Sequence, residues 1–394
     1  MMEKIRLGDI ATTITKGTTP TTIGFPFVDT GINFVKIESI DEAGNFLPDR
    51  FAHITDECNR KLGRSKLEEN DILFSIAGAI GRTAIVTKSI LPANTNQALA
   101  IIRIPSNAIN LQFVLYALQS QAVAEQSAKQ KQGVAQLNLS LKNIADIQIP
   151  LVSSEKQAEI VRILAALDVT IGQRKEQIKF IDQLVKSRFI ELFGDCLSNP
   201  KGWKTKCLED IADVGSSKRV FVEELREDGI PFFRGTEVGA LAEGKSVSPE
   251  LFITEEHYAA LCSATGAPQI GDLLMPSICP DGRIWVVNTD KPFYFKDGRV
   301  LWIHAIDASF NSTFLLYSLK DRIMTDYSSI ASGTTFAELK IFSLKKCKVF
   351  AAPLTLQNEF AAFVEQTDKS KLAVQKGLQE LEILKKSLMQ QYFG

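Results

Sequence analysis

The sequence predicts an α+β fold. It consists of two mixed α/β domains joined by two long α-helices, which form an antiparallel coiled coil with internal pseudo-two-fold symmetry. Two observations predict this fold class. The chain repeats itself at an offset of about 200 residues, and each copy changes from a strand-like part to a long helical part.

The repeat is clearest at the end of each copy. Gln157–Gly194 aligns without gaps with Gln357–Gly394, and eight of the 38 positions are identical, where average residue frequencies would give about two. Four upstream pairs follow in the same order: LGDIA with LEDIA, GINFVK with GIPFFR, NDILFS with GDLLMP, and GRTAIV with GRIWVV. The chain is therefore a tandem duplication.

Each copy begins with about 150 strand-like residues. Short β-branched and aromatic runs such as INFVKI, ALAIIRI and RIWVVNT are separated by Gly, Pro and Asn. The last part of each copy instead has apolar residues at the 4–3 spacing of a heptad repeat. These residues are Ile160, Leu164, Leu167, Ile171, Ile178, Ile181, Val185 and Leu192 in the first copy, and Phe360, Val364, Val374, Leu378, Leu381, Leu388 and Tyr392 in the second.

The two predicted helices are unusually long, about 57 Å for 38 residues. Gly172 and Gly377 each cost up to ~1 kcal/mol relative to Ala, so tertiary pairing must stabilise the helices. The stripe of apolar heptad residues on each helix could pack against the sheet of its own copy. Because the two stripes have similar lengths, pairing of the two helices with each other is favoured. In an antiparallel pair, each terminal Phe-Gly would lie beside the start of the other helix. We expect some stripe residues to be exposed without a partner: Phe180, Phe189 and Phe360.

Composition excludes several classes of protein. The 45% apolar and 23% charged residues describe a globular protein, no segment approaches the ~20 apolar residues of a membrane span, and a cytoplasmic location is expected. Six scattered cysteines and three distant histidines make a zinc site improbable, and no metal site is predicted. The net charge of −1 leaves binding of nucleic acid open.

Several motifs together resemble the specificity (S) subunit of type I restriction–modification systems. They are LGDIA, TKGTTP, GINFVK, NDILFSIAG, the IQIPL that precedes EKQAEIV, NPKGW and the terminal FG. The resemblance covers essentially the whole chain, twice. The second copy departs from it in AAPLTLQNEF, and Thr367 and Lys371 interrupt its stripe.

The resemblance implies a function and a set of partners. Residues 1–150 and 196–352 would be target recognition domains, each reading one part of a bipartite, asymmetric site in double-stranded DNA. The conserved helices at 151–195 and 353–394 would set the unread spacer and dock two methyltransferase subunits, and restriction subunits would join this core. S-adenosylmethionine is expected in the methyltransferase subunits, and no cofactor is expected in this chain.

Candidate DNA-binding residues lie in loops between the predicted strands, where cations can contact phosphates and amides can pair with base edges. In the first copy they are Lys16, Thr18, Thr19, Lys36, Arg82, Asn94, Asn96, Gln97, Lys131 and Gln132. In the second copy they are Ser217, Lys218, Arg219, Arg234, Arg283, Lys296, Arg299, Thr334 and Thr335.

Comparison of the two copies divides these candidates. Lys36 of the first copy aligns with Arg234 of the second, and Arg82 aligns with Arg283, so both copies carry a cation at each of these two positions. This favours a shared contact with DNA. Residues that read bases should instead differ between the copies. The segments NTNQ in the first copy and FKDGR in the second differ in this way, so they are the stronger candidates for reading bases.

Catalysis by this chain is not expected. No Walker-type loop or G-x-S-x-G motif occurs, and Asn199-Pro200-Lys201 lacks the features of a methyltransferase site. Asp326 with Glu338 and Lys340 has the spacing of a nuclease motif, but the first copy lacks it. The alternative to a specificity subunit is a stand-alone duplicated DNA-binding protein that acts without methyltransferase partners.

Overall fold

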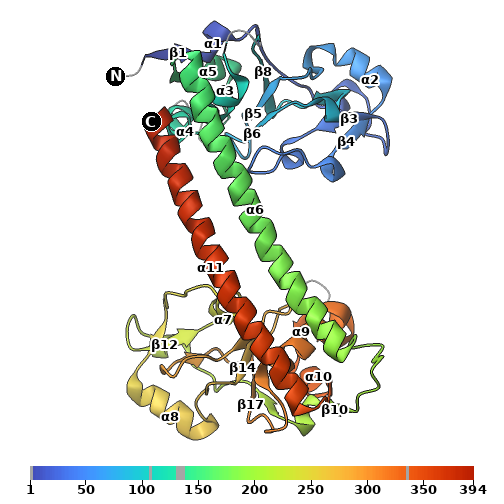
Figure 1. The fold of residues 1–394 in the computed structure, drawn as a ribbon, viewed down its shortest axis with the longest axis vertical. Coiled ribbons are helices and arrows are strands. Elements are labelled where there is room, and N and C mark those ends of the chain that lie inside the picture. Colours follow the sequence, from blue (N-terminus) through green and yellow to red (C-terminus); the bar gives the residue numbers. More distant parts are fainter. Residues whose placement is uncertain (1–2, 106–108, 130–137, 334–336) are drawn as a thin grey trace. The chain divides into compact units, whose positions relative to one another are not determined.

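The computed structural model describes residues 3–105, 109–129, 138–333 and 337–394. The chain divides into two compact units (Figure 1). Unit 1 comprises Met1–Lys175 and Gln375–Gly394, and unit 2 comprises Glu176–Val374. Each unit therefore combines the strand-containing part of one copy with segments of both long helices.

The strands of unit 1 are β1 (Lys4–Arg6), β2 (Thr13–Lys16), β3 (Ile32–Val35), β4 (Ala52–Ile54), β5 (Ile72–Ser75), β6 (Thr83–Ile85), β7 (Ala93–Thr95), β8 (Leu99–Arg103) and β9 (Gln148–Pro150). Four of them form an antiparallel sheet in the order β2–β8–β5–β6. A second sheet has the order β4–β3–β7, in which β3 and β7 run parallel. β1 pairs with β9.

The strands of unit 2 are β10 (Thr205–Cys207), β11 (Asp213–Gly215), β12 (Ile230–Phe233), β13 (Phe252–Ile253), β14 (Leu273–Pro276), β15 (Trp285–Val286), β16 (Tyr294–Phe295), β17 (Val300–His304), β18 (Ala331–Ser332), β19 (Glu338–Leu339) and β20 (Lys348–Phe350). Their sheets have the orders β11–β17–β14–β15 and β13–β12–β16, with β12 and β16 parallel. β10 pairs with β20, and β18 with β19. Apart from β18 and β19, unit 2 repeats the topology of unit 1.

The α-helices of unit 1 are α1 (Leu7–Ile10), α2 (Asp56–Lys61), α3 (Leu111–Leu118), α4 (Gln121–Lys129) and α5 (Leu141–Ala145), and those of unit 2 are α7 (Gly235–Ala242), α8 (Glu255–Thr265), α9 (Ser312–Ile330) and α10 (Ile341–Lys345). Two helices belong to both units: α6 (Ser154–Phe193) and α11 (Leu354–Phe393). α3 and α9 begin alike, because the side chains of Asn110 and Asn311 each accept hydrogen bonds from two backbone amides of the first turn.

Ion pairs show that α6 and α11 run antiparallel within each unit. In unit 1, Asp168 pairs with Lys385, and Lys175 pairs with Glu382 at 3.0 Å. In unit 2, Asp182 pairs with Lys371 at 2.6 Å and Arg188 with Glu359 at 2.7 Å. As residue numbers rise along α6, those of the partners fall along α11. The predicted fold class, with two mixed α/β domains and two long antiparallel helices, is confirmed.

The predicted apolar stripe lies against the partner helix and the sheets. In unit 1, Ile160 and Leu164 are buried, and in unit 2 Val185 and Val364 are buried. The division of the chain into 1–150, 151–195, 196–352 and 353–394 stays a prediction, because the two compact units cut across both long helices.

One prediction about the stripe was partly wrong. Phe180 is 64% exposed, as expected, but Phe189 and Phe360 are 2% and 0% exposed. Their rings lie 5.4 Å apart in an aromatic cluster that includes Phe314 of α9. A heptad pattern does not distinguish these sites from Phe180, because α9, far away in sequence, provides the covering surface.

The repeated Phe-Gly ends complete the cores of the opposite copies. Phe393 is 1% exposed and packs on Phe113 of unit 1, with a ring-centroid distance of 5.2 Å. Phe193 is fully buried in unit 2, where its ring centroid lies 4.6 Å from that of Phe314 and 5.7 Å from that of Phe360. The predicted place of each helix end beside the start of the other helix is confirmed.

The repeated glutamines also have a structural role. Gln157 Oε1 accepts a hydrogen bond from the backbone amide of Asn110, and Gln357 Oε1 accepts one from that of Asn311, at 3.0 and 2.8 Å. Both glutamines are buried, so each bond satisfies a polar group that would otherwise be costly. The identity at this position therefore anchors the first turn of each long helix to the neighbouring short helix.

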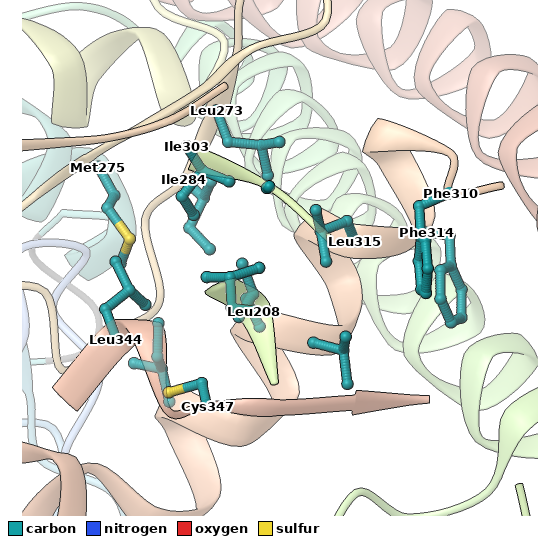
Figure 2. Packing of buried hydrophobic residues seen from close by; sticks show 14 of the residues in the cluster. Leu208, Leu273, Met275, Ile284, Ile303, Phe310, Phe314, Leu315, Leu344 and Cys347 are labelled. Atoms are coloured by element: carbon teal, nitrogen blue, oxygen red, sulfur yellow. The ribbon is translucent and has the colours of Figure 1, made fainter. Parts of the chain in front are cut away.

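Unit 2 has a large apolar core between its sheet and its helices (Figure 2). Leu273 and Met275 of β14 and Ile303 of β17 meet Leu315 of α9 and Leu344 of α10. The central strands read as apolar runs because both of their faces are covered. None of the described helices is long and apolar enough to cross a membrane.

Candidate nucleic-acid interface

In unit 1, one strand edge gathers three of the predicted segments. Lys16 ends β2 and Lys36 follows β3, whereas Asn96 and Gln97 follow β7. Because β3 and β7 are parallel, their carboxyl ends meet at the same edge. Thr95 donates a hydrogen bond from its hydroxyl to the backbone oxygen of Val35 at 2.8 Å, which joins the two strand ends.

The loop after β2 is held against the loop after β7. The backbone amide of Gly17 donates to the Asn96 oxygen at 3.1 Å, and the Thr19 hydroxyl donates to Gln97 Oε1 at 2.6 Å. A Cβ atom on Gly17 would lie 1.8 Å from the backbone oxygen of Thr95, so only glycine permits this contact. Thr18 is half-buried and Gln97 is exposed at this edge.

Asn94 does not belong to an exposed interface. It is fully buried, and its amide nitrogen donates to Asn59 Oδ1 and to the Leu62 oxygen, at 2.9 and 3.2 Å. Its amide oxygen accepts from the Ser65 hydroxyl at 2.7 Å. These bonds leave no accessible amide for a base, so Asn94 is removed from the candidates. All three residues of β7 are buried, and only Asn96 and Gln97, which follow the strand, are accessible.

Unit 2 has the same edge with different residues. Ser217 occupies the place of Gly17, and its hydroxyl donates to the Phe295 oxygen at 2.6 Å. The backbone amide of Lys296 donates to the Phe233 oxygen at 2.9 Å, which joins the carboxyl ends of β12 and β16. After β7, unit 1 exposes Gln97, whereas after β16 unit 2 exposes Lys296 and, two and three residues further on, Gly298 and Arg299.

Three cations of the unit 2 edge are exposed and form no ion pair with any described residue: Lys218, Arg219 and Lys296. The Arg219 guanidinium lies 5.5 Å from the ring centroid of Phe221, which is itself 51% exposed. Unpaired cations beside an accessible ring match the surface that nucleic acid requires, since cations neutralise phosphates and rings stack on bases.

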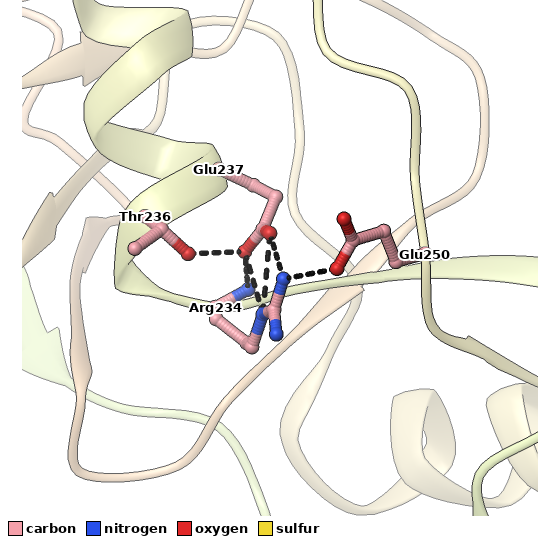
Figure 3. Close-up of polar contacts among 4 residues, drawn as sticks. All are labelled: Arg234, Thr236, Glu237 and Glu250. Carbon is pink, nitrogen blue, oxygen red and sulfur yellow. Dashed lines mark hydrogen bonds and ion pairs between the residues drawn. The ribbon is translucent and has the colours of Figure 1, made fainter. Parts of the chain in front are cut away.

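The paired cations Lys36 and Arg234 differ in their surroundings. Lys36 Nζ lies 4.5 Å from the ring centroid of Phe27 and 4.0 Å from Glu38. Arg234 instead forms ion pairs with two carboxylates, Glu237 and Glu250 (Figure 3). These pairs occupy much of the Arg234 guanidinium, so a DNA phosphate would have to compete with both carboxylates.

The hydrogen bonds between Arg234 and its carboxylate partners shift the pKa values of both Arg234 and Glu237. The hydrogen bonds that Arg234 donates to Glu237 and Glu250 raise the pKa of Arg234. Burial alone would raise the pKa of Glu237, but hydrogen bonds from Arg234 and Thr236 outweigh it and lower that pKa from 4.5 to about 2. Sequence reasoning missed both carboxylates, although Glu237 lies only three residues after Arg234, at the capping-box spacing of α7.

Arg82 and Arg283 brace the segments that follow these cations. Arg82 Nη1 donates to the backbone oxygens of Ile37 and Ile40, at 3.2 and 2.9 Å. Arg283 pairs with Asp281 at 2.8 Å, and its guanidinium packs so close to Gly239 of α7 that a Cβ there would meet Nη1 at 2.8 Å. The two arginines thus have a structural reason to be kept in both copies, in addition to the predicted contact with DNA.

Arg299 belongs to an ion cluster that has no counterpart among the described residues of the first copy. Glu338 pairs with Arg299 and, at 2.6 Å, with Lys340. These pairs lower the pKa of the Glu338 carboxyl, and the hydrogen bond from Lys340 is the main cause. Asp326 pairs separately with Arg322 at 3.0 Å. The spacing that resembles a nuclease motif therefore reflects two ion-pair groups, each with a structural partner.

Four predicted residues, Lys131, Gln132, Thr334 and Thr335, lie outside the described residues. Of the others, Asn94 and Ser217 are buried, and the rest lie at or beside the two strand edges.

Comparison with known proteins identifies the family of this chain. The family model of the type I restriction modification DNA specificity domain matches residues 1–181 and again residues 200–383. The chain therefore belongs to this family. It is a type I restriction–modification specificity subunit with two DNA recognition domains, and the resemblance inferred from its motifs is confirmed.

Individual relatives cover different shares of the chain. The type I restriction enzyme MjaIX specificity subunit of Methanocaldococcus jannaschii is 23% identical over 362 residues, which are 86% of this chain and 80% of the relative. The EcoBI specificity subunit of Escherichia coli is 36% identical over 207 residues, 50% of this chain and 42% of the relative.

Two solved structures share the fold. A chain from a structure of type I R-M system assembly and conformational transition has a TM-score of 0.60 at 18% identity, covering 99% of this chain and 97% of that one. The S subunit from M. genitalium has a TM-score of 0.55 at 15% identity, covering 100% and 96%.

Proposed function

We propose that the chain reads a bipartite, asymmetric site in double-stranded DNA, with unit 1 and unit 2 each reading one part. The observation that carries this proposal is the pair of strand edges. They have the same topology and the same cation positions, but the segment after β7 in unit 1 offers Asn96 and Gln97, whereas the segment after β16 in unit 2 offers Lys296 and Arg299. An amide pairs best with adenine and a cation with guanine, so the two edges suit different bases.

The long helices supply a second part of the proposal, a scaffold for two methyltransferase subunits. Each unit exposes large apolar residues on its helix pair. They are Val169, Ile383 and Leu384 in unit 1, and Phe180, Leu184 and Leu372 in unit 2. Exposed apolar residues of this size are costly in water and favour a protein partner. Restriction subunits would join the methyltransferase core, and the chain itself would bind no cofactor and perform no catalysis. S-adenosylmethionine would be bound by the methyltransferase subunits.

Mapping of methylated bases tests the reading of two half-sites. The chain is co-expressed with its methyltransferase subunits, and host DNA is sequenced for methylated positions. Gln97→Ala should relax one half of the site by ~1–3 kcal/mol per base, and Lys296→Ala should change only the other half. Gln121→Ala and Lys201→Ala, which change exposed residues away from the edges, are the controls.

The outcomes separate the proposal from its alternatives. A variant in one unit that changes the bases read in both halves would refute the assignment of one half to each unit. If the chain were instead a stand-alone DNA-binding protein, it would stay soluble and bind its site without methyltransferase subunits. Co-purification of the chain with methyltransferase subunits distinguishes these two functions.

Both helices pass from one unit into the other, so we propose that their length sets the unread spacer. Seven residues inserted after Leu184, with seven more in α11 near Lys369, keep the heptad phase. Lys369 is chosen because Asp182 pairs with Lys371. The insertion lengthens each helix by about 10 Å, or about three base pairs. The spacer should grow by that amount while both half-sequences stay unchanged, and a change in the bases read would refute the ruler.

A further inference from the structure

A cleft of about 590 Å³ in unit 2 lies apart from the residues assigned to the strand edges. It opens between the segment after α6, helix α9 and the turn from α10 to β20, and this volume is typical of small-molecule sites. Its lining combines cationic and hydroxyl groups with apolar side chains, including Ser318, Arg322, Lys346, Lys348, Ile330 and Phe350.

Two buried donors in the lining have no hydrogen-bond partner among the described residues. They are the hydroxyl of Ser318, a residue that is 5% exposed, and Nε of Arg322. The two residues are four positions apart on α9 and so share one face of the helix. A buried donor without a partner costs about 1–3 kcal/mol. An arginine Nε can only donate, so the missing partner is an acceptor.

Arg322 is held in place from the other side. Its Nη2 donates to Asp326 Oδ2 at 3.0 Å, and Asp326 has non-helical backbone angles where α9 kinks. This pair fixes one edge of the guanidinium and leaves Nε without a partner. Both free donors are buried atoms of residues that line the cleft, so a ligand would bind with a change of side-chain rotamer.

The charges of the lining favour an anion. Three cations line the cleft, with no carboxylate among the lining residues. Arg322 and Lys346 are paired from outside the lining with Asp326 and Glu209, whereas Lys348 forms no ion pair with any described residue. Burial, together with Asp321, raises the pKa of the Cys196 thiol to about 12, so this lining residue is neutral near neutral pH.

The duplication supplies an internal comparison. Asn311 and Phe314 of α9 correspond to Asn110 and Phe113 of α3, so Ser318 and Arg322 correspond to Ala117 and Gln121. Gln121 is exposed and hydrogen-bonds Glu125 at 3.2 Å. The shared fold therefore does not require a hydroxyl and a guanidinium at these positions.

We propose that this cleft binds a small organic oxyanion, a phosphate or carboxylate that carries an apolar group. Ser318 and Arg322 donate to its oxygens, Lys348 contributes charge, and Ile330 and Phe350 contact its apolar part. The site goes beyond the proposed reading of DNA and does not depend on it.

Thermal unfolding of the full chain, alone or with its methyltransferase subunits, tests the site without DNA. Phosphate and phenyl phosphate are compared with chloride at equal ionic strength. Both should raise the unfolding temperature, and phenyl phosphate should bind more tightly because its ring is buried against apolar residues. Acetate and benzoate form a second pair that distinguishes phosphate from carboxylate ligands.

The first copy provides the variants. Arg322→Gln and Ser318→Ala install the corresponding residues of the first copy, Gln121 of α4 and Ala117 of α3. Arg322→Gln should weaken phenyl phosphate binding about tenfold. Lys291→Gln, which removes an exposed cation outside the lining, should leave binding unchanged.

Equal binding of phenyl phosphate by the wild type and Arg322→Gln would overturn the site, as would the absence of any shift in unfolding temperature with all four anions. Equal affinities for the ring-bearing and ring-free anions would overturn the apolar part. If Arg322→Gln alone unfolds the chain, Ser318→Ala, which removes only one hydroxyl, provides the same comparison.

Discussion

Replacing Phe393 by Ala should destabilise unit 1 and leave unit 2 almost unchanged. Phe393 is 1% exposed and its ring packs on Phe113. Removal of a buried phenylalanine side chain costs about 3–5 kcal/mol, because it loses its transfer free energy and leaves a cavity. The effect should appear in the core of residues 1–175, although the substitution lies more than 200 residues further along the chain.

Hydrogen exchange measured by mass spectrometry resolves the two units separately. For amides that exchange through opening of unit 1, such as those of β5 and β8, a loss of 3 kcal/mol raises the rate about 100-fold. Amides of β14 and β17 in unit 2 should keep their rates. Phe193→Ala should give the reverse pattern, because Phe193 is fully buried in unit 2.

Leu384→Ala is the matched control. Leu384 lies on the same helix but is 47% exposed, so its truncation should change stability by about 0.5 kcal/mol or less. Equal acceleration of exchange in both units by Phe393→Ala, or unchanged exchange in β5 and β8, would refute the conclusion that the end of α11 completes the core of unit 1.

Three further predictions concern single residues. Gly17→Ala should disrupt the unit 1 edge, because its Cβ would lie 1.8 Å from the Thr95 oxygen; binding of the DNA half read by unit 1 should weaken while the other half is unaffected, as measured by methylation mapping. Phe180→Ser should reduce co-purification of methyltransferase subunits without lowering the unfolding temperature, since the side chain is 64% exposed. The Glu237 carboxylate has a pKa lowered from 4.5 to about 2, so its stabilisation is complete above pH ~4.5 and is lost as the pH falls toward 2. Glu237→Gln should therefore flatten the acid-unfolding profile of unit 2 in that window, and an unchanged profile would show that the pair with Arg234 does not stabilise the fold.

Local patterns predicted the architecture well. The repeat of Gln157 and Gln357 and the spacing of Ile160, Leu164 and their counterparts required only comparison of the chain with itself. Helix periodicity and turn residues are local properties, so they can be recognised in the sequence without knowledge of tertiary contacts. The similar length of both stripes favoured pairing of the two helices, and their predicted antiparallel direction agrees with the ion pairs between α6 and α11.

The detailed environment of single side chains could not be predicted in the same way. Asn94 was expected to reach DNA, but Asn59 and Ser65, about 30 residues earlier, bury its amide. Likewise, Phe189 is covered by Phe314 of α9. Both errors concern contacts between segments distant in sequence, which neither periodicity nor spacing encodes.

The crossed ends of the long helices also set an order for synthesis of the chain. Residues 3–105 leave the ribosome early, but the core they form includes Phe393 and packs against Leu388 and Tyr392. Unit 2 has all of its segments as soon as residue 374 has emerged. The domain that is made first is therefore finished last. Until then it exposes an unfilled apolar surface that chaperones, or the helix end of a second nascent chain, can occupy.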